Sequence, residues 1–110
     1  NESIRGKFPI KWTAPEVLRQ SIFTSKSDCW SFGILLWEIY SFGRIPYPRI
    51  TNFQPIQDVI RHIEQGYRME PPEHCPLQIS HLMSACWELE PTARPSFAEI
   101  VNKLKRFIGY

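Results

Sequence analysis

Residue types that could bind phosphate groups or metal ions are sparse in this chain and widely separated. Its only aspartates, Asp28 and Asp58, lie 30 positions apart, whereas divalent cations that assist phosphoryl transfer are held by clustered oxygen ligands. A loop that cradles a phosphate needs closely spaced glycines, because only bare backbone comes near enough to the oxygens. The five glycines are too far apart for this: Gly6, Gly33, Gly43, Gly66 and Gly109. The sequence therefore contains no complete catalytic constellation, and no catalytic residue is assigned.

Four residues in the second half of the chain have side chains that zinc prefers: His74, Cys75, His81 and Cys86. His74 and Cys75 are neighbours and cannot easily face one ion together, and the set contains no CxxC-like pair. We therefore expect no metal site here. Cys86 is expected to be buried, and the two histidines are expected at the surface.

The composition is that of an ordinary globular domain, with 43% hydrophobic and 22% charged residues. A net charge of +2 is too small to indicate binding to nucleic acid or to an anionic membrane. No stretch has the roughly 20 apolar residues that a membrane-spanning helix needs. Three cysteines beside apolar neighbours indicate reduced thiols in a reducing compartment.

The elements that position the side chains are predicted to be helices. The strongest signal spans about residues 27–41, where apolar residues cover every face, and this predicts a central helix buried on all sides. Ser25 and Asp28 have the spacing of a reciprocal cap at its start. Three tryptophans are expected in the core: Trp30, Trp37 and Trp87.

Three further segments repeat apolar residues at the spacing of an amphipathic helix: 56–63, 79–87 and 97–108. Ser96 and Glu99 form a capping box for the last of these, and Gly109 marks its end. A short helical turn is expected after Pro15, and residues 7–11 are expected to be extended. The sequence thus predicts one all-α domain. Five basic side chains are expected to be solvated: Arg61, Arg68, Lys103, Lys105 and Arg106.

Several short segments contain residues that this helical pattern does not explain. They are FPIKWTAPE at 8–16, KSDCWSFG at 26–33, Pro46-Tyr47-Pro48, Cys86-Trp87 and RPSF at 94–97. The first resembles the end of the activation segment in protein tyrosine kinases, which closes on an Ala-Pro-Glu triplet. The second resembles the central helix of the kinase C-terminal lobe, and the last two resemble its final helices. The stretch LLWEIYSFGRIPYPRI at 35–50 is most similar to the C-terminal Src kinase group.

This resemblance covers almost the whole chain. It implies that residues 1–110 are the C-terminal portion of a cytoplasmic, non-receptor tyrosine kinase domain, from the end of the activation segment to the last helix. The complete parent would use ATP and Mg²⁺ to phosphorylate tyrosine in protein substrates, and missing N-terminal domains could recruit it to a membrane. The kinase elements that bind ATP and magnesium are absent from this sequence. We therefore expect the 110-residue fragment alone to be inactive.

By the same resemblance, a wall for the substrate is formed by Pro9, Ile10, Lys11 and Trp12. The Pro9 ring would lie against the ring of the acceptor tyrosine. A proline ring costs little entropy to hold against an aromatic face, and this favours tyrosine over serine. The alternative is a packed Pro-Trp corner with no ligand.

The resemblance assigns a structural role in the kinase fold to seven residues: Ala14, Pro15, Glu16, Asp28, Trp30, Gly33 and Arg94. Glu16 is expected to pair with Arg94 and so to clamp the end of the loop onto the lobe. Asp28 would accept backbone N–H bonds from the catalytic loop of a complete kinase. Within this fragment, a helix cap is its other possible role.

Two other interpretations are open. The first is a kinase-like lobe that acts as a scaffold without catalysis, as in pseudokinases. The aspartates of the upstream HRD and DFG motifs would distinguish it from an enzyme. The second is an unrelated helical adaptor, for which the order of the motifs would be a coincidence.

Overall fold

The computed structural model describes residues 10–48, 50 and 55–109, and all regular structure in this part of the chain is helical. The elements are the short 3₁₀ helices η1 (Ile10–Trp12) and η2 (Pro91–Ala93) and the helices α2 (Pro15–Gln20), α3 (Ser25–Tyr40), α4 (Pro55–Glu64), α5 (Leu77–Cys86) and α6 (Phe97–Ile108). The prediction of an all-α lobe is confirmed. None of these helices is long and apolar enough to cross a bilayer.

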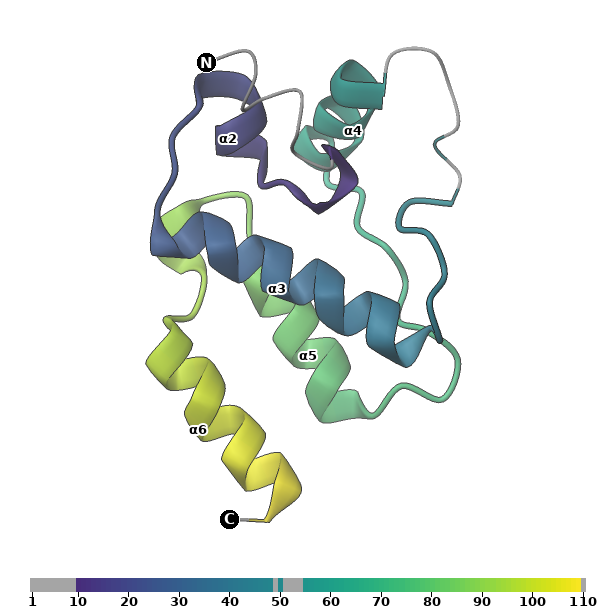
Figure 1. Ribbon diagram of the computed structural model, residues 1–110, viewed down its shortest axis with the longest axis vertical. Helices are drawn as coiled ribbons and strands as arrows, with labels where there is room; N and C mark the ends of the chain where they lie inside the picture. Colours follow the sequence, from purple (N-terminus) through teal and green to yellow (C-terminus); the bar gives the residue numbers. More distant parts are fainter. Residues whose placement is uncertain (1–9, 49, 51–54, 110) are drawn as a thin grey trace.

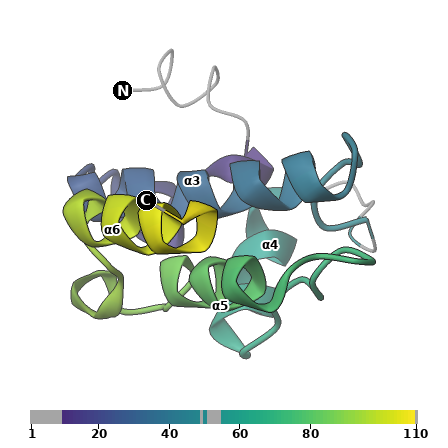
Figure 2. The same cartoon turned by 90° about the horizontal axis from the view of Figure 1, so that it is seen from below.

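Helix α3 crosses the middle of the molecule, and α5 packs along it (Figure 1). Helices α2 and α4 lie together on one side of α3, and α6 lies at the opposite end beside the C-terminus. The view from below places α6 and α5 next to the same central helix (Figure 2). Residues from α3, α4, α5 and the loops between them share one core.

The start of α3 differs from the prediction. The helix begins at Ser25 rather than near 27, and its N-cap is Thr24, whose side chain accepts hydrogen bonds from the backbone of Lys26 and Ser27. Ser27 completes the capping box by accepting from the Thr24 backbone. The predicted cap between Ser25 and Asp28 is therefore wrong by one position. The extended backbone that an N-cap requires occurs at Thr24, with φ −143°.

Burial of α3 on all sides was also expected, and this is only partly correct. Its inner face is buried and includes Trp30 and Trp37, but Leu35 and Ile39 are about half exposed. The elements that pack on α3 in the described part of the chain leave that stripe open. The three predicted core tryptophans, Trp30, Trp37 and Trp87, are all buried.

Gly33 allows α3 and α5 to come close together. A Cβ atom at this position would lie 2.7 Å from the Trp87 indole nitrogen and 2.9 Å from the Cβ of Cys86. Both distances are too short for van der Waals contact, so any larger residue would force the helices apart. The packing gives a physical reason for a glycine in the central helix.

The outer helices agree with the sequence. Helix α6 begins at the predicted capping box of Ser96 and Glu99 and ends at Gly109, which has the left-handed φ of 101° that favours glycine. Ile100 is its buried residue, and its other side chains lie partly or fully at the surface. Helix α6 is therefore an amphipathic cover, in contrast to the central α3.

Candidate functional site

The segment predicted to face a substrate forms a tight turn. Ile10, Lys11 and Trp12 make the 3₁₀ helix η1, which is closed by a hydrogen bond of 3.2 Å from the Thr13 N–H to the Ile10 carbonyl. The expectation of extended backbone is therefore wrong at Ile10 and Lys11. Pro9, with the rest of 7–9, lies outside the residues that the structure describes. All three side chains of the turn are partly buried, so each keeps some exposed surface.

Side-chain hydrogen bonds hold the Ile10–Trp12 turn against the body of the lobe. Ser31 Oγ donates to the Trp12 carbonyl at 2.7 Å, and the Trp12 indole N–H donates to Glu38 Oε1. Lys11 Nζ donates to the Tyr47 carbonyl at 3.4 Å. The turn also packs against α3 and α4. Its position is therefore set by residues that are distant in the sequence.

The next residues form an ion pair with the far end of the chain. Pro15 occupies the first turn of α2, where its missing N–H costs nothing, and Glu16 follows it. Glu16 Oε2 and Oε1 accept hydrogen bonds from Arg94 Nη1 at 2.8 Å and Nη2 at 2.9 Å. Ser27 Oγ donates to the same carboxylate at 2.9 Å. The predicted pairing of Glu16 with Arg94 is confirmed, and we call it the clamp.

Arg94 is the centre of the clamp. Its side chain is 0% exposed, and that of Glu16 is 12% exposed. Besides Glu16, the guanidinium donates to three backbone carbonyls: Glu88, Lys26 and Leu89. Together these bonds can use all five of its N–H donors. A buried cation needs such complete pairing, because an unpaired charge in the interior is strongly destabilising.

Trp30 joins the clamp to a second arginine. The guanidinium of Arg94 lies 5.0 Å from the centre of the Trp30 ring, and that of Arg68 lies 5.4 Å from it. Arg68 donates to the carbonyls of Trp87, Ile63 and Tyr67 at 2.7–2.8 Å. The expectation that Arg68 is solvated is therefore wrong. Burial lowers the pKa of this guanidinium.

The electrostatics of Glu16 follow from its partners. Burial by itself raises the pKa of this carboxyl group, because it disfavours the charged form. The hydrogen bonds from Arg94 and Ser27 and the positive charge of Arg94 act in the opposite direction and together hold the Glu16 pKa below its ordinary value. The clamp is therefore an ion pair at neutral pH.

The remaining predicted structural residues lie at different places. Ala14 is buried and is the N-cap of α2, although it makes no side-chain cap. Asp28 is exposed in the first turn of α3, where a negative charge suits the positive end of the helix dipole. Gly33 lies at the contact with α5. The structure thus brings Glu16, Trp30 and Arg94 together and leaves Asp28 at the surface.

Sequence reasoning missed several residues of this site. Glu38, Ser31 and Lys26 were not singled out, although Lys26 Nζ donates to the Arg94 carbonyl. Tyr47 was named only within the Pro46-Tyr47-Pro48 segment and given no role, but it is buried with a positive φ of 50°, and its backbone N–H lies 3.1 Å from the sulfur of Met69. For Glu38 a signal existed, since it is the one charged residue in the otherwise largely apolar stretch 29–40 of α3.

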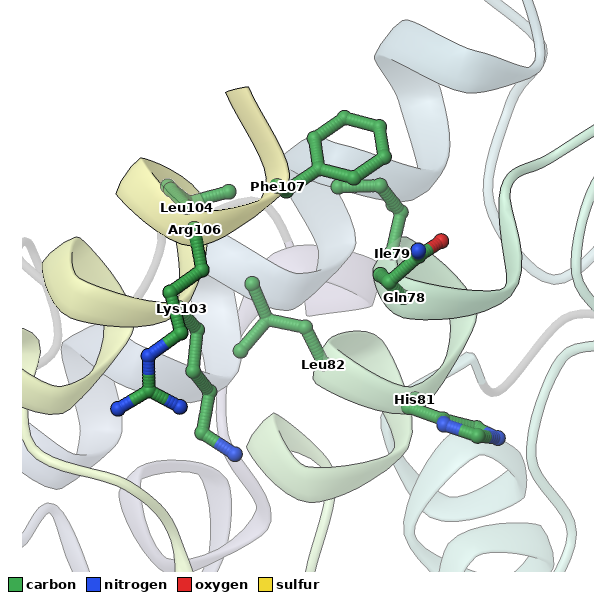
Figure 3. Close-up of a pocket in the computed structure, with 8 residues that line it drawn as sticks. All are labelled: Gln78, Ile79, His81, Leu82, Lys103, Leu104, Arg106 and Phe107. Atoms are coloured by element: carbon green, nitrogen blue, oxygen red, sulfur yellow. The ribbon is translucent and has the colours of Figure 1, made fainter. Parts of the chain in front are cut away.

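Two cavities lie away from the turn and the clamp. One, of about 330 Å³, lies between α5 and α6, with Leu82, Leu104 and Phe107 on its walls and Lys103 and Arg106 at its rim (Figure 3). The other, of about 640 Å³, lies beside Trp37 and Tyr67. Neither is lined by a residue of the Ile10–Trp12 turn.

Side chains that commonly bind metal ions do not cluster in the described part of the chain. Within residues 10–48, 50 and 55–109, no group of three His, Cys, Asp or Glu side chains could hold a metal ion. The aspartates do not form a shared site either: Asp28 is exposed on α3, and Asp58 on α4 pairs with Arg61. These residues are therefore assigned no role in binding a nucleotide or a metal ion.

Comparison with known proteins identifies similar sequences over nearly the whole chain. A family model described as "Protein tyrosine and serine/threonine kinase" matches residues 1–104. Tyrosine-protein kinase csk-1 of Caenorhabditis elegans is 62% identical over 104 residues, which are 94% of this chain and 19% of that protein. Megakaryocyte-associated tyrosine-protein kinase of Rattus norvegicus is 53% identical over 101 residues, 92% of this chain and 21% of the relative. The chain thus spans about a fifth of the length of these relatives.

Proposed function

The chain belongs to the protein tyrosine kinase family and is most similar to its C-terminal Src kinase group, and from this premise we propose that it is the C-terminal portion of a non-receptor tyrosine kinase domain. The complete enzyme would transfer the γ-phosphate of ATP to tyrosine in protein substrates. Its ATP and Mg²⁺ would be bound by upstream elements. The proposed location is the cytoplasm, with recruitment to a membrane through N-terminal domains.

The observation that carries this proposal is the way the Ile10–Trp12 turn is held. The turn lies directly before the buried residues Thr13–Pro15, and the clamp fixes the next residue, Glu16, to Arg94. A peptide-binding wall needs such a rigid support, because a displacement of about 1 Å can cost about a hundredfold in rate. We therefore propose Pro9, Ile10, Lys11 and Trp12 as the substrate-facing wall and the clamp as its scaffold.

The clamp residues themselves are proposed to act in architecture rather than in chemistry. Arg94 is fully buried, and its donors are occupied by the carboxylate and by backbone carbonyls. It has no free donor to offer to a phosphate. For Asp28, which is exposed, we propose a contact with the catalytic loop of the complete kinase domain.

The proposal is tested with two proteins, the 110-residue chain and a complete kinase that contains it. Each is incubated with radiolabelled ATP, Mg²⁺ and a random copolymer of glutamate and tyrosine. We expect tyrosine phosphorylation by the complete protein and none by the fragment. A copolymer with serine in place of tyrosine is the control for the acceptor. No transfer by the complete protein would favour the pseudokinase scaffold instead.

A second experiment tests the substrate wall. Replacing Pro9 by glycine in the complete kinase removes the rigid ring, and we expect the KM for a tyrosine peptide to rise several-fold while the KM for ATP stays constant. Pro71→Gly is the matched control, because Pro71 is an exposed proline outside the turn. An equal effect of both changes would mean that Pro9 forms a packed corner without a ligand.

A further inference from the structure

Glu38 is a carboxylate placed among apolar residues of the central helix. It lies in the last turns of α3, between the buried Trp37 and the exposed Ile39, and it is itself partly buried. Its Oε1 accepts the hydrogen bond from the indole N–H of Trp12, 26 positions earlier in the chain. Hydrogen bonds to an ionised acceptor are stronger than those between neutral groups. A charged group is therefore used here to hold an aromatic ring.

The contact acts together with a second one on the same helix. Ser31 lies seven positions before Glu38, which is about two helical turns, so the two side chains share a face of α3. Ser31 holds the Trp12 backbone through its carbonyl, and Glu38 holds the far end of the side chain through the indole nitrogen. Two fixed points restrict both the position and the rotation of the ring.

The same face of α3 also reaches the clamp. Ser27 lies one turn before Ser31 and donates to Glu16 Oε2. One face of the central helix therefore contacts the loop on both sides of its Ala14-Pro15 corner: Glu16 after it and Trp12 before it. Because α3 is regular, the separation between these two contacts is fixed.

Resting on the proposed function, we propose that Glu38 is a positioning residue for peptide recognition: it fixes the orientation of the Trp12 indole and thereby the form of the substrate-facing wall. Glu38 acts through Trp12 and is assigned no contact with the reacting atoms. Without its acceptor, the indole could rotate about the side-chain bonds while the backbone stayed in place on Ser31. Peptide binding would then weaken, whereas nucleotide binding would not change.

The test uses a complete kinase that contains this segment, with steady-state kinetics for a tyrosine peptide and for ATP. We expect Glu38→Ala to raise the KM for the peptide about tenfold, which corresponds to loss of one hydrogen bond to a charged group. Glu38→Gln keeps an oxygen acceptor without the charge, so its peptide KM should lie between those of wild type and Glu38→Ala. Glu73→Ala is the control, since Glu73 is an exposed glutamate outside the site. All three variants should leave the KM for ATP unchanged.

A double variant separates positioning from general damage. Trp12→Phe removes the donor but keeps an aromatic ring, and we expect the pair Trp12→Phe with Glu38→Ala to be no worse than the more affected single variant. Additive losses, or a peptide KM that Glu38→Ala leaves unchanged, would overturn the proposal. A fall in melting temperature together with equal losses for peptide and ATP would also overturn it, because that pattern indicates a purely structural residue.

A spectroscopic readout distinguishes failure of this inference from failure of the proposed function. Hydrogen exchange of the Trp12 indole N–H, followed by NMR with ¹⁵N-labelled tryptophan, should be slow in wild type and fast in Glu38→Ala. If the wild-type kinase phosphorylates no tyrosine peptide but its indole is protected, the proposed function fails and the Glu38 contact stands. If it is active and the indole exchanges equally fast in both proteins, the positioning role of Glu38 fails.

Discussion

Helix α2 takes part in two ion pairs of the same chemical type in opposite environments. Glu16 binds Arg94 inside the lobe, where the side chains are 12% and 0% exposed. Three positions later, Arg19 binds Glu64 of α4 at the surface, with exposures of 55% and 36%. Both pairs join a guanidinium to a carboxylate across a long stretch of sequence. The difference lies in the surroundings, because only the inner pair must satisfy its charges without water.

The two pairs show that the burial of an arginine, and not its charge alone, decides how much its ion pair contributes to stability. A surface pair contributes about 0–1 kcal/mol, because water competes for both partners. Breaking a buried pair leaves one charge without a partner and costs about 3–5 kcal/mol. We therefore expect the two ends of α2 to differ strongly in their sensitivity to substitution, and four predictions test this.

The largest effect is expected at the inner pair. Arg94→Ala or Glu16→Ala should destabilise the fold by about 3–5 kcal/mol, a large part of the 5–15 kcal/mol available to a typical domain. Urea unfolding followed by circular dichroism measures the loss. Arg94→Lys should restore little, since lysine lacks the planar fork that binds two carboxylate oxygens. A loss below about 1 kcal/mol for Arg94→Ala would show that burial does not separate the pairs.

The second effect is expected at Arg68, which separates burial from ion pairing because its hydrogen bonds go to carbonyls instead of a carboxylate. Arg68→Met keeps an apolar stem beside Trp30 but removes the hydrogen bonds from the guanidinium to three carbonyls. Of these, within the described part of the chain, only the Ile63 carbonyl has a further donor, the Gly66 N–H. We expect a destabilisation of about 1–3 kcal/mol, measured in the same urea titration. Arg106→Met is the matched surface control, as Arg106 is an exposed arginine on α6. Equal losses in the free energy of unfolding for the two variants would show that burial of an arginine does not decide its contribution to stability.

The third prediction uses pH. The pKa of Glu16 is lower in the folded protein than its ordinary value of 4.5, so the folded state favours the carboxylate. This stabilisation is fully present above the ordinary pKa and is lost as the pH falls through the lower, folded pKa. Unfolding midpoints measured between pH 6 and about pH 3 should therefore fall for the wild type. Glu16→Gln should show a smaller fall over the same range, and an identical slope in both proteins would refute the assignment to Glu16.

The smallest effect is expected at the outer pair. Arg19→Ala and Glu64→Ala should each change the free energy of unfolding by less than about 1 kcal/mol. A double-mutant cycle should give a small coupling energy that decreases further at high salt, because salt screens exposed charges. A coupling energy as large as that between Glu16 and Arg94 would show that the exposed pair and the buried pair contribute equally to stability.

Local features of this protein were determined by the sequence itself. The apolar spacing located α4, α5 and α6, and the box of Ser96 and Glu99 with Gly109 defined the limits of α6 correctly. Such signals act within about one helical turn, so they can be seen in neighbouring residues. The order of the motifs pointed to the kinase lobe and, through that resemblance, to the pairing of Glu16 with Arg94.

Other features were decided only by the tertiary structure. Arg68 and Arg61 look alike in the sequence, but only Arg68 lies beneath Trp30 and reaches three carbonyls. The contact of Trp12 with Glu38 likewise depends on how the turn packs across α3. Burial and long-range hydrogen bonds are set by elements far apart in the chain, and no spacing of neighbouring residues contains that information. The sequence thus determined the helices and the family, and packing decided which charges support the site.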